Sequence, residues 1–352
     1  MLYQTMNLHG GDIYSDHVEL DFSANLNPLS IPHSVLESMK ETLSDSSHYP
    51  DPYCRDAIRA ISEHEKLPDR YIMMGNGAAE LIYSFCLSVS PQKALIPVPS
   101  FSEYENALKL NNCKVTSYLL QPSNEFLLDS NFLEAIAEEK PDVIFLCNPN
   151  NPTGRAIDAD LLHKIIQLTG ILGIGLFLDE CFIDLSENCT EMKKFIPDHK
   201  NLFILKALTK SYALAGIRAG YCLSSDQKLL ERMSKTVQPW NVSTIAQSAV
   251  IAALKEKSYI IEARKIIHRE RRWLNEKLNS LGCHTYPSEA NFILFQAPYG
   301  LDVYLKSVGI SIRNCSNFDG LDHSWYRIAI RLHSENEILI RNIRNFMEDT
   351  AK

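Results

Sequence analysis

The stretch KALTKSYALAGIRAG, residues 206–220, places two lysines and an arginine among small and apolar residues. It continues the apolar run NLFIL, so that Lys210 comes just after the expected end of a buried strand. Lys206 still lies within that run, and we interpret it as an ordinary surface or strand-end cation. One of these cations can be catalytic only if suitable polar groups follow the other strands of the same domain.

Short apolar runs alternate with longer helix-like segments through the middle of the chain. The strand-like runs are KALIPVP, KVTSYLL, PDVIFLCNP, GIGLFLDE and NLFILKAL, and helix-like segments such as SEYENALKLN and LLHKIIQLTG lie between them. Strands joined by crossover helices predict an α/β domain with a mostly parallel central sheet. We assign this large domain to residues 36–235.

The pattern changes near residue 236. STIAQSAVIAALKE and the longer IIEARKIIHRERRWLNEKLNSLG, which ends at Gly282, predict two helices. NFILFQ, GISIRN and YRIAIRL alternate as the strands of a small sheet, and a terminal helix follows. We therefore expect a smaller α/β C-terminal domain over residues 236–352 and a separate N-terminal segment over residues 1–35.

The overall composition is that of a globular protein, and it excludes several classes of partner. The 352 residues are 45% hydrophobic and 22% charged, with a formal net charge of −8. An acidic chain is not expected to bind nucleic acid without sequence preference, because such binding needs clustered lysines and arginines. No apolar run approaches the about 18 residues of a membrane-spanning helix, so no membrane partner is expected.

Nine cysteines are spread along the chain without a CxxC pair or a regular spacing. This odd and irregular set argues against a disulfide framework and against a zinc site, and it favours reduced thiols. The N-terminus lacks the basic segment and apolar block of a signal peptide. We therefore expect a cytoplasmic protein.

A glycine-containing turn, MMGNGAAELIY, is the first candidate binding motif. Gly75 and Gly77 stand between a short apolar run and a helical pattern. Backbone N–H groups at such a helix N-terminus can bind a phosphate. The motif lacks the third glycine of a dinucleotide fingerprint, and on its own a plain turn explains it at least as well.

Two further motifs follow strand-like runs. LCNPNNPTGRAI presents Asn148, Asn150 and Asn151 where a buried strand ends, with an Asx-rich turn as the alternative. GLFLDECFIDL ends its run on Asp179, an acid that could cap a helix or bind a metal. No His or Cys cluster supplies further metal ligands, so we expect no metal site and favour an organic cofactor.

Asn151, Asp179 and Lys210 each follow a strand of the expected parallel sheet, and we expect them to meet at one edge of it. Such a trio suits pyridoxal 5′-phosphate. The amine binds the cofactor covalently, the carboxylate holds a proton on the pyridine nitrogen, and the amide bonds the ring hydroxyl. Arg218 follows on a bending loop, near enough to reach the same phosphate as the glycine turn.

The ordered motifs GNGAAE, NPNNPTG, LDE and LTKSYALAGIRAGY resemble those of the fold-type-I pyridoxal-phosphate enzymes, the aminotransferase superfamily, over nearly the whole chain. The resemblance implies that Lys210 is the Schiff-base lysine and that Asp179 binds the pyridinium nitrogen. It also implies a set of cofactor contacts: Gly77, Ala78, Thr209 and Arg218 to the phosphate, Asn151 to the ring hydroxyl, and Phe101 or Tyr104 over the ring face.

The same resemblance implies an assembly. Enzymes of this superfamily share their active sites between two subunits, and Tyr49 of HYPDP matches a tyrosine that the partner subunit lends. We therefore expect a homodimer with shared active sites. The resemblance also implies that the N-terminal segment folds onto the small domain.

Within the superfamily the chain resembles two families, the histidinol-phosphate aminotransferases and the L-threonine O-3-phosphate decarboxylases of cobalamin biosynthesis. HGGDIY, DFSANLNPL and IRNCSNFDGL match the decarboxylases, and YRIAIRL carries Arg331 where the aminotransferases generally have glycine. Phe182 stands where most aminotransferases have a tyrosine bonded to the cofactor hydroxyl. The resemblance favours decarboxylation of O-phospho-L-threonine or O-phospho-L-serine over transamination of histidinol phosphate or a related phosphorylated amine. A non-catalytic binding module is a third and weaker alternative, since every cofactor-contacting position holds a competent residue.

Three arginines on adjacent strand-like segments, Arg313, Arg327 and Arg331, predict the binding of one carboxylate and one phosphate. A surface ion pair is the alternative for Arg331. The resemblance adds His9, Asn27 and Asn151 as substrate contacts. For His9 the alternative is a turn histidine beside Gly10 and Gly11.

Overall fold

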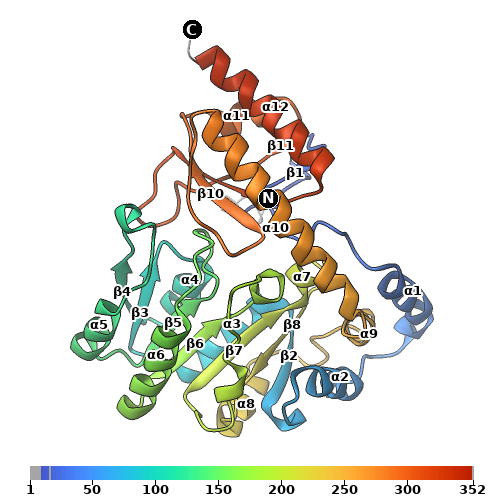
Figure 1. Cartoon of the computed structure of the whole chain (residues 1–352). Helices are drawn as coiled ribbons and strands as arrows, with labels where there is room; N and C mark the ends of the chain where they lie inside the picture. Colours follow the sequence, from blue (N-terminus) through green and yellow to red (C-terminus); the bar gives the residue numbers. More distant parts are fainter. Residues whose placement is uncertain (1–8, 16, 351–352) are drawn as a thin grey trace.

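The computed structural model describes residues 9–15 and 17–350. The chain forms a broad part built on a large sheet and a narrower part built on a small sheet. The long helix α10 (Lys257–Ser280) runs from one part to the other (Figure 1).

The large sheet has seven strands in the order β2-β8-β7-β6-β5-β3-β4. All neighbouring pairs from β7 to β4 are parallel, whereas β8 is antiparallel to both β2 and β7. The predicted α/β class with a mostly parallel sheet is therefore confirmed. The strands are β2 (Ile72–Asn76), β3 (Lys93–Val98), β4 (Lys114–Leu119), β5 (Val143–Cys147), β6 (Gly175–Asp179), β7 (Leu202–Ala207) and β8 (Ala219–Leu223).

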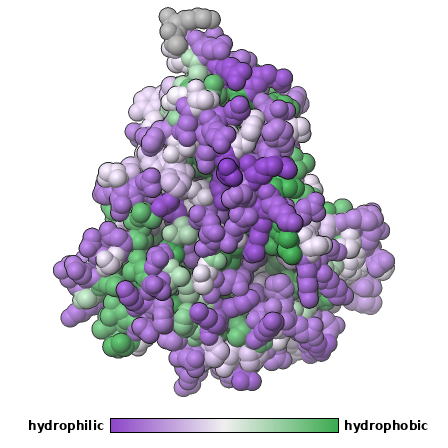
Figure 2. Space-filling model, in the orientation of Figure 1, coloured by the Kyte–Doolittle hydropathy of each residue, from purple (hydrophilic) through white to green (hydrophobic). Residues whose placement is uncertain are grey.

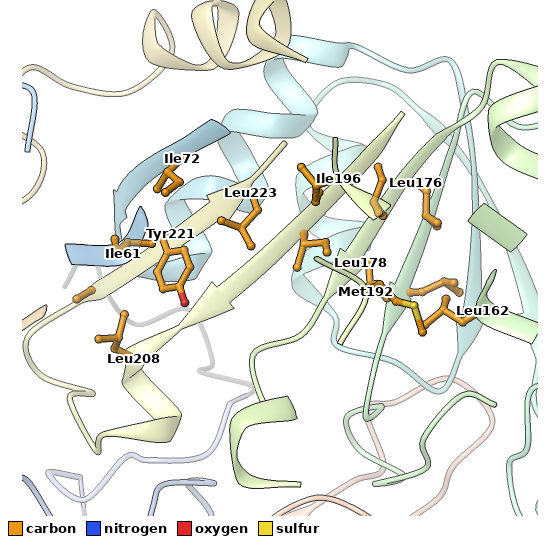
Figure 3. Close-up of a cluster of buried hydrophobic side chains, with 14 of the residues drawn as sticks. Ile61, Ile72, Leu162, Leu176, Leu178, Met192, Ile196, Leu208, Tyr221 and Leu223 are labelled. Carbon is orange, nitrogen blue, oxygen red and sulfur yellow. The ribbon is translucent and has the colours of Figure 1, made fainter. Parts of the chain in front are cut away.

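Helices cover both faces of this sheet, which is why its central strands are almost wholly apolar. Successive side chains of a strand point to opposite faces, so that Ile144 and Leu146 pack on one side of β5 while Phe145 packs on the other. One face carries α2 (Arg55–Glu65), α5 (Asn131–Glu139) and α6 (Ala159–Leu172), and part of this core is drawn in Figure 3. The other face carries α3 (Gly77–Val89), α4 (Glu103–Lys109) and α8 (Gln227–Ser234).

The small sheet is antiparallel, with strand order β12-β13-β10-β9. It packs with α10, α11 (Leu301–Ser307) and α12 (His333–Thr350) around a core of its own. Its strands are β9 (His284–Thr285), β10 (Phe292–Gln296), β12 (Arg313–Asn314) and β13 (Trp325–Ala329).

Residues 20–22 of the expected N-terminal segment lie on the small domain. Strand β1 (Leu20–Asp21) pairs in parallel with β11 (Ile310–Ser311), and Phe22 is fully buried in the core of the small domain. Residues 20–22 therefore contribute a strand and a core side chain to the small domain, whose partner strand β11 begins 290 residues after β1.

The boundary between the domains is best judged from α9 (Thr244–Ala253). This helix packs against α1 (His33–Thr42) and α2, and its Ala246 and Val250 belong to the core of the large sheet. The boundary expected at residue 235 stays a prediction, and the packing of α9 favours a position between α9 and α10 instead.

The face of the molecule in Figure 2 is largely hydrophilic, with smaller hydrophobic areas. Within the described part of the chain, no helix combines the length and the hydrophobicity needed to cross a membrane.

Candidate active site

A cavity of about 220 Å³ lies where the carboxyl ends of β5, β6 and β7 meet the small domain. Its wall combines residues of the large domain, among them Asn151, Asp179 and Lys210, with Arg313 and Arg327 of the small sheet. The trio expected at one sheet edge therefore lies around a single cavity.

Lys210 enters the cavity from α7 (Leu208–Ser211), which begins directly after β7. Its Nζ makes no hydrogen bond or ion pair with the described residues, and it lies 5.9 Å from the centre of the Phe182 ring. Burial, together with the positive charges of Arg327 and Arg218, lowers the pKa of Lys210 to about 8. A larger fraction of this amine is neutral near pH 7 than for an ordinary lysine, which makes it a better nucleophile.

Asp179 ends β6 and is buried on the same wall. Its Oδ1 accepts the backbone N–H of Cys181 at 2.8 Å, and its Oδ2 accepts the Tyr104 hydroxyl at 2.6 Å. Burial raises the pKa of Asp179, and these two hydrogen bonds oppose that effect. A cationic N–H ligand would complete the stabilisation of this carboxylate.

The two aromatic candidates, Phe101 and Tyr104, have different surroundings. Tyr104 is fully buried and its hydroxyl is committed to Asp179. Phe101 remains partly exposed at the cavity, with its ring centre 5.6 Å from that of Tyr104 at a steep angle. Tyr104 thus fixes the acid, and because both rings line the cavity, the choice between them as the ring that covers the cofactor stays a prediction.

The N-terminus of α3 forms one end of the cavity. A Cβ at Gly77, where φ is 75°, would lie 2.6 Å from Arg218 Nη2, so that only glycine lets the guanidinium lie over the first turn. Ala78, Thr209 and Arg218 line the cavity there. The first N–H groups of a helix have no partners within the helix, and together with a guanidinium they favour an anion such as phosphate.

Arg327 is a buried cation on the opposite, small-domain wall. One of its terminal nitrogens donates to Asn151 Oδ1, and Nη2 donates to the Ser23 carbonyl at 2.9 Å. Its Nε has no hydrogen-bond partner in the described part of the chain, and burial lowers its pKa to about 10. A buried guanidinium that is bonded only to neutral groups is suited to a carboxylate ligand.

Arg313 lies directly opposite Arg327 in the register of β12 and β13. Its guanidinium donates to the Asn314 carbonyl and to Asn317 Oδ1. Neither arginine forms an ion pair with a carboxylate of the described residues. Like charges at directly opposed positions destabilise a strand pair, and an anion in the cavity would relieve this repulsion.

Two expected substrate contacts do not reach the cavity. Arg331 is outside its lining, because the guanidinium pairs with Glu335 at 2.6 Å and donates to the Asp21 carbonyl. Asn27 is also outside it, since Nδ2 donates to the Ser211 carbonyl at 2.8 Å and Oδ1 accepts the N–H of Leu29. The motif DFSANLNPL supplies Asn25 instead, which lines the cavity and has no partner for its buried Oδ1 among the described residues.

Lys206 lies at the end of β7, as one of the two expected alternatives had it, but the other alternative, a surface cation, is wrong. Its side chain is 2% exposed, and Nζ lies 2.8 Å from Asp184 Oδ1 and 3.0 Å from Glu191 Oε1. No local pattern predicted this site, because its carboxylates come from the 3-10 helix Ile183–Leu185 and from a loop rather than from the strand.

Of the remaining expected residues, His9 lines the cavity and Tyr49 does not. The Tyr49 side chain is 77% exposed and stacks on Trp240 with a distance of 4.4 Å between ring centres. Its expected role in the site of a partner subunit stays a prediction.

Sequence reasoning missed Asn25, the hydrogen bond from Tyr104 to Asp179, and Glu103, which forms a hydrogen bond with His9. The only sequence signal for Glu103 and Tyr104 was their place beside Phe101.

The residues around the cavity fit pyridoxal 5′-phosphate. Asp179 offers an acid to the ring nitrogen, and the first turn of α3 with Arg218 offers an anion site. Lys210 Nζ, Thr209 Oγ1 and Asn151 Nδ2 are polar groups without a hydrogen-bond partner in the described part of the chain. These are the donors and the amine that such a cofactor would use.

Comparisons with known proteins agree with this chemistry. The family model for aminotransferase class I and II matches residues 18–343. The threonine-phosphate decarboxylase of Salmonella typhimurium is 34% identical over 355 residues, which cover 97% of each protein.

Two solved structures extend the comparison. The histidinol-phosphate aminotransferase of Clostridium acetobutylicum matches with a TM-score of 0.87 at 32% identity, over 94% of this chain and 99% of that one. The histidinol-phosphate aminotransferase of Sinorhizobium meliloti in complex with pyridoxal-5′-phosphate has the same TM-score at 20% identity, over 99% and 97%, and shares the fold. The chain belongs to the aminotransferase class I and II family, and its cofactor is pyridoxal 5′-phosphate.

Proposed function

We propose that the chain is a decarboxylase that releases CO2 from a phosphorylated amino acid, either O-phospho-L-threonine or O-phospho-L-serine. The observation that carries the proposal is the opposed pair Arg313 and Arg327, two guanidinium groups in the cavity wall without a carboxylate partner among the described residues. Such a substrate brings one carboxylate and one phosphate, and a guanidinium fork suits both.

The cofactor, when bound, supplies a ring that withdraws electrons from the substrate Cα. Arg327 would hold the substrate carboxylate, and the direction in which it holds that group would decide whether Cα loses CO2 or a proton. Lys210, with a pKa of about 8, can then deliver a proton to Cα.

Phe182 supports the same reaction. It is buried in the cavity wall beside Lys210 and has no hydroxyl to offer the cofactor. The donor that most aminotransferases place at this position is therefore missing. The 34% identity to the decarboxylase of Salmonella typhimurium points in the same direction.

Transamination of histidinol phosphate or a related phosphorylated amine is the second candidate. The 32% identity and shared fold with the Clostridium acetobutylicum aminotransferase favour it. The same phosphate contacts would serve both substrates, so the reaction outcome has to be measured. The two decarboxylase substrates differ by one methyl group, for which a pocket discriminates by only about 1–3 kcal/mol.

The proposal includes a homodimer in which Tyr49 completes the partner's site. An exposed tyrosine stacked on Trp240, which is itself 45% exposed, supplies an aromatic surface for such a contact. It also includes a cytoplasmic location, since all nine cysteines are free thiols.

One assay separates the two reactions. Holoenzyme is incubated with O-phospho-L-threonine, O-phospho-L-serine and histidinol phosphate, each with 2-oxoglutarate, and CO2 and glutamate are measured. We expect CO2 from a phospho-amino acid and little glutamate. Glutamate without CO2 would assign the chain to the aminotransferases.

A further inference from the structure

Glu103 of the large domain holds the start of the described chain against the cavity. The His9 Nε2 lies 2.9 Å from Glu103 Oε1, in the first turn of α4. His9 and Gly10 both line the cavity, and the His9 ring centre lies 5.6 Å from that of Phe101. His9, which joins this segment to the large domain, therefore also lines the cavity.

The same segment is fixed on the small-domain side by its glycines. The Gly11 N–H donates to Ser23 Oγ at 2.7 Å, and a Cβ at Gly10 would lie 2.3 Å from the Ser23 carbonyl oxygen. A larger residue at Gly10 would push the segment away. The Ser23 carbonyl also accepts from Arg327, so the HGG turn bridges the arginine wall and α4.

The Glu103 carboxylate accepts two further hydrogen bonds. Tyr83 of α3 donates its hydroxyl to Oε2 at 2.6 Å, and Asn106 donates to Oε1 at 2.9 Å. The hydrogen bond from His9, followed by those from Tyr83 and Asn106, lowers the pKa of Glu103 to about 2 against the effect of burial. Glu103 therefore stays ionised at neutral pH and is a fixed hydrogen-bond acceptor beside the His9 ring.

The cavity also lacks one of its expected cations. Arg331 is paired with Glu335 outside the lining, which leaves Arg313 and Arg327 for a substrate that carries a carboxylate and a phosphate. We propose that Glu103 is a positioning residue that orients the His9 imidazole as a further partner for the substrate phosphate. This inference rests on the proposed function and names a residue that sets its preference for phosphorylated amino acids.

The test compares two ligands on the holoenzyme. Dissociation constants for O-phospho-L-threonine and L-threonine are measured from the cofactor absorbance, and kcat and KM are measured for the phosphorylated compound. We expect Glu103→Gln to weaken O-phospho-L-threonine binding and raise its KM about tenfold, with kcat within about twofold, because one charge-assisted contact is lost. Binding of L-threonine should stay within about twofold of wild type, because it has no phosphate to lose the contact.

Two further variants make the result specific. Tyr83→Phe keeps the ring and removes one bond to Glu103, and it should weaken the phosphorylated ligand alone by about threefold. Glu105→Gln is the matched control, since Glu105 lies on the same helix and pairs with Lys109 at 2.8 Å. It should leave both ligands unchanged.

Two results overturn the assignment of Glu103 while leaving the proposed function in place. One is that Glu103→Gln weakens the binding of O-phospho-L-threonine and L-threonine equally. The other is that neither Glu103→Gln nor Tyr83→Phe changes the binding of O-phospho-L-threonine. A wild-type enzyme that binds both ligands equally well overturns the phosphate-directed function and the role of Glu103 with it.

Discussion

Lys206 and Lys210 come from one short stretch of sequence and are both withdrawn from solvent, yet their surroundings are opposite. Lys206 points among carboxylates, with Asp184 and Glu191 within 3.0 Å of its Nζ. Lys210 points into the cavity, whose lining includes the guanidinium groups of Arg327 and Arg218 as well as the Asp179 carboxylate, and its Nζ has no ion pair with the described residues.

The pKa values follow from these neighbours. Burial alone would lower the pKa of Lys206, but Asp184, Glu65 and Glu191 raise it well above its usual value. For Lys210 burial and the two arginines act in the same direction, and its pKa falls to about 8. The comparison teaches that the carboxylates around a buried amine, rather than burial itself, decide whether it is structural or reactive.

The structural lysine belongs to a wider network. Lys193 joins Glu191 at 2.8 Å to Glu65 at 2.7 Å, and the Tyr221 hydroxyl donates to Glu65. Every charge in this group has an opposite charge beside it. In the cavity around Lys210, by contrast, Arg313 and Arg327 have no carboxylate partner among the described residues, and a bound anion would provide one.

Removing the reactive amine should have the largest effect. We expect Lys210→Ala to lower turnover by at least about 10⁴-fold, because a covalent catalyst and proton carrier is lost. Turnover and circular dichroism are measured together. A variant with native spectrum and activity within tenfold of wild type would show that Lys210 has no chemical role.

The structural lysine should respond in stability instead. Lys206→Met removes the buried cation beside Asp184 and one of the two cations beside Glu191, both carboxylates being partly buried, and we expect the free energy of unfolding to fall by about 1–3 kcal/mol. Urea denaturation measures it. Lys194→Met is the control, since Lys194 is exposed and should change stability by less than about 0.5 kcal/mol. Equal stability of both variants would contradict the contrast between the two lysines.

The arginines offer the next contrast. Arg327→Ala should lower kcat/KM for the phosphorylated substrate about 100-fold, because a buried, charge-assisted contact is lost. Arg331→Ala should change it by less than about threefold, since its guanidinium is committed to Glu335. A larger loss at Arg331 than at Arg327 would restore the sequence-based expectation for Arg331.

The smallest effect is expected from the loss of the hydrogen bond between Tyr104 and Asp179. Tyr104→Phe removes a hydrogen bond that lowers the pKa of Asp179, so this pKa should rise further and the carboxylate should be protonated at higher pH. We expect the cofactor to dissociate about tenfold more readily at neutral pH, and the difference from wild type should grow as the pH falls. Equilibrium dialysis across pH measures this. A difference that is independent of pH would rule out an effect through Asp179.

Much of the fold could be predicted because strand ends and motifs coincide along the chain. Asn151, Asp179 and Lys210 each follow a buried strand, and parallel strands bring their carboxyl ends to one edge. The antiparallel β8 and the packing of α9 on α1 and α2 were not readable, because pairing direction and docking depend on contacts between distant segments.

The site was less predictable wherever the direction of a side chain decides its role. Asn25 and Asn27 stand in one motif, and only the backbone path separates the one in the cavity from the one behind Lys210. The surface alternative for Lys206 was wrong for a related reason, and the position of Arg331 outside the cavity lining was not readable. Their carboxylate partners could be recognised only once loops and a helix N-terminus were placed around them.

The most direct measurement locates the cofactor on the chain. The holoenzyme is reduced with borohydride and digested, and the modified lysine is identified by mass spectrometry. The account predicts the cofactor on Lys210 alone, with Lys206 unmodified in its carboxylate cluster. Cofactor on Lys206, or on any lysine outside the cavity, would contradict it.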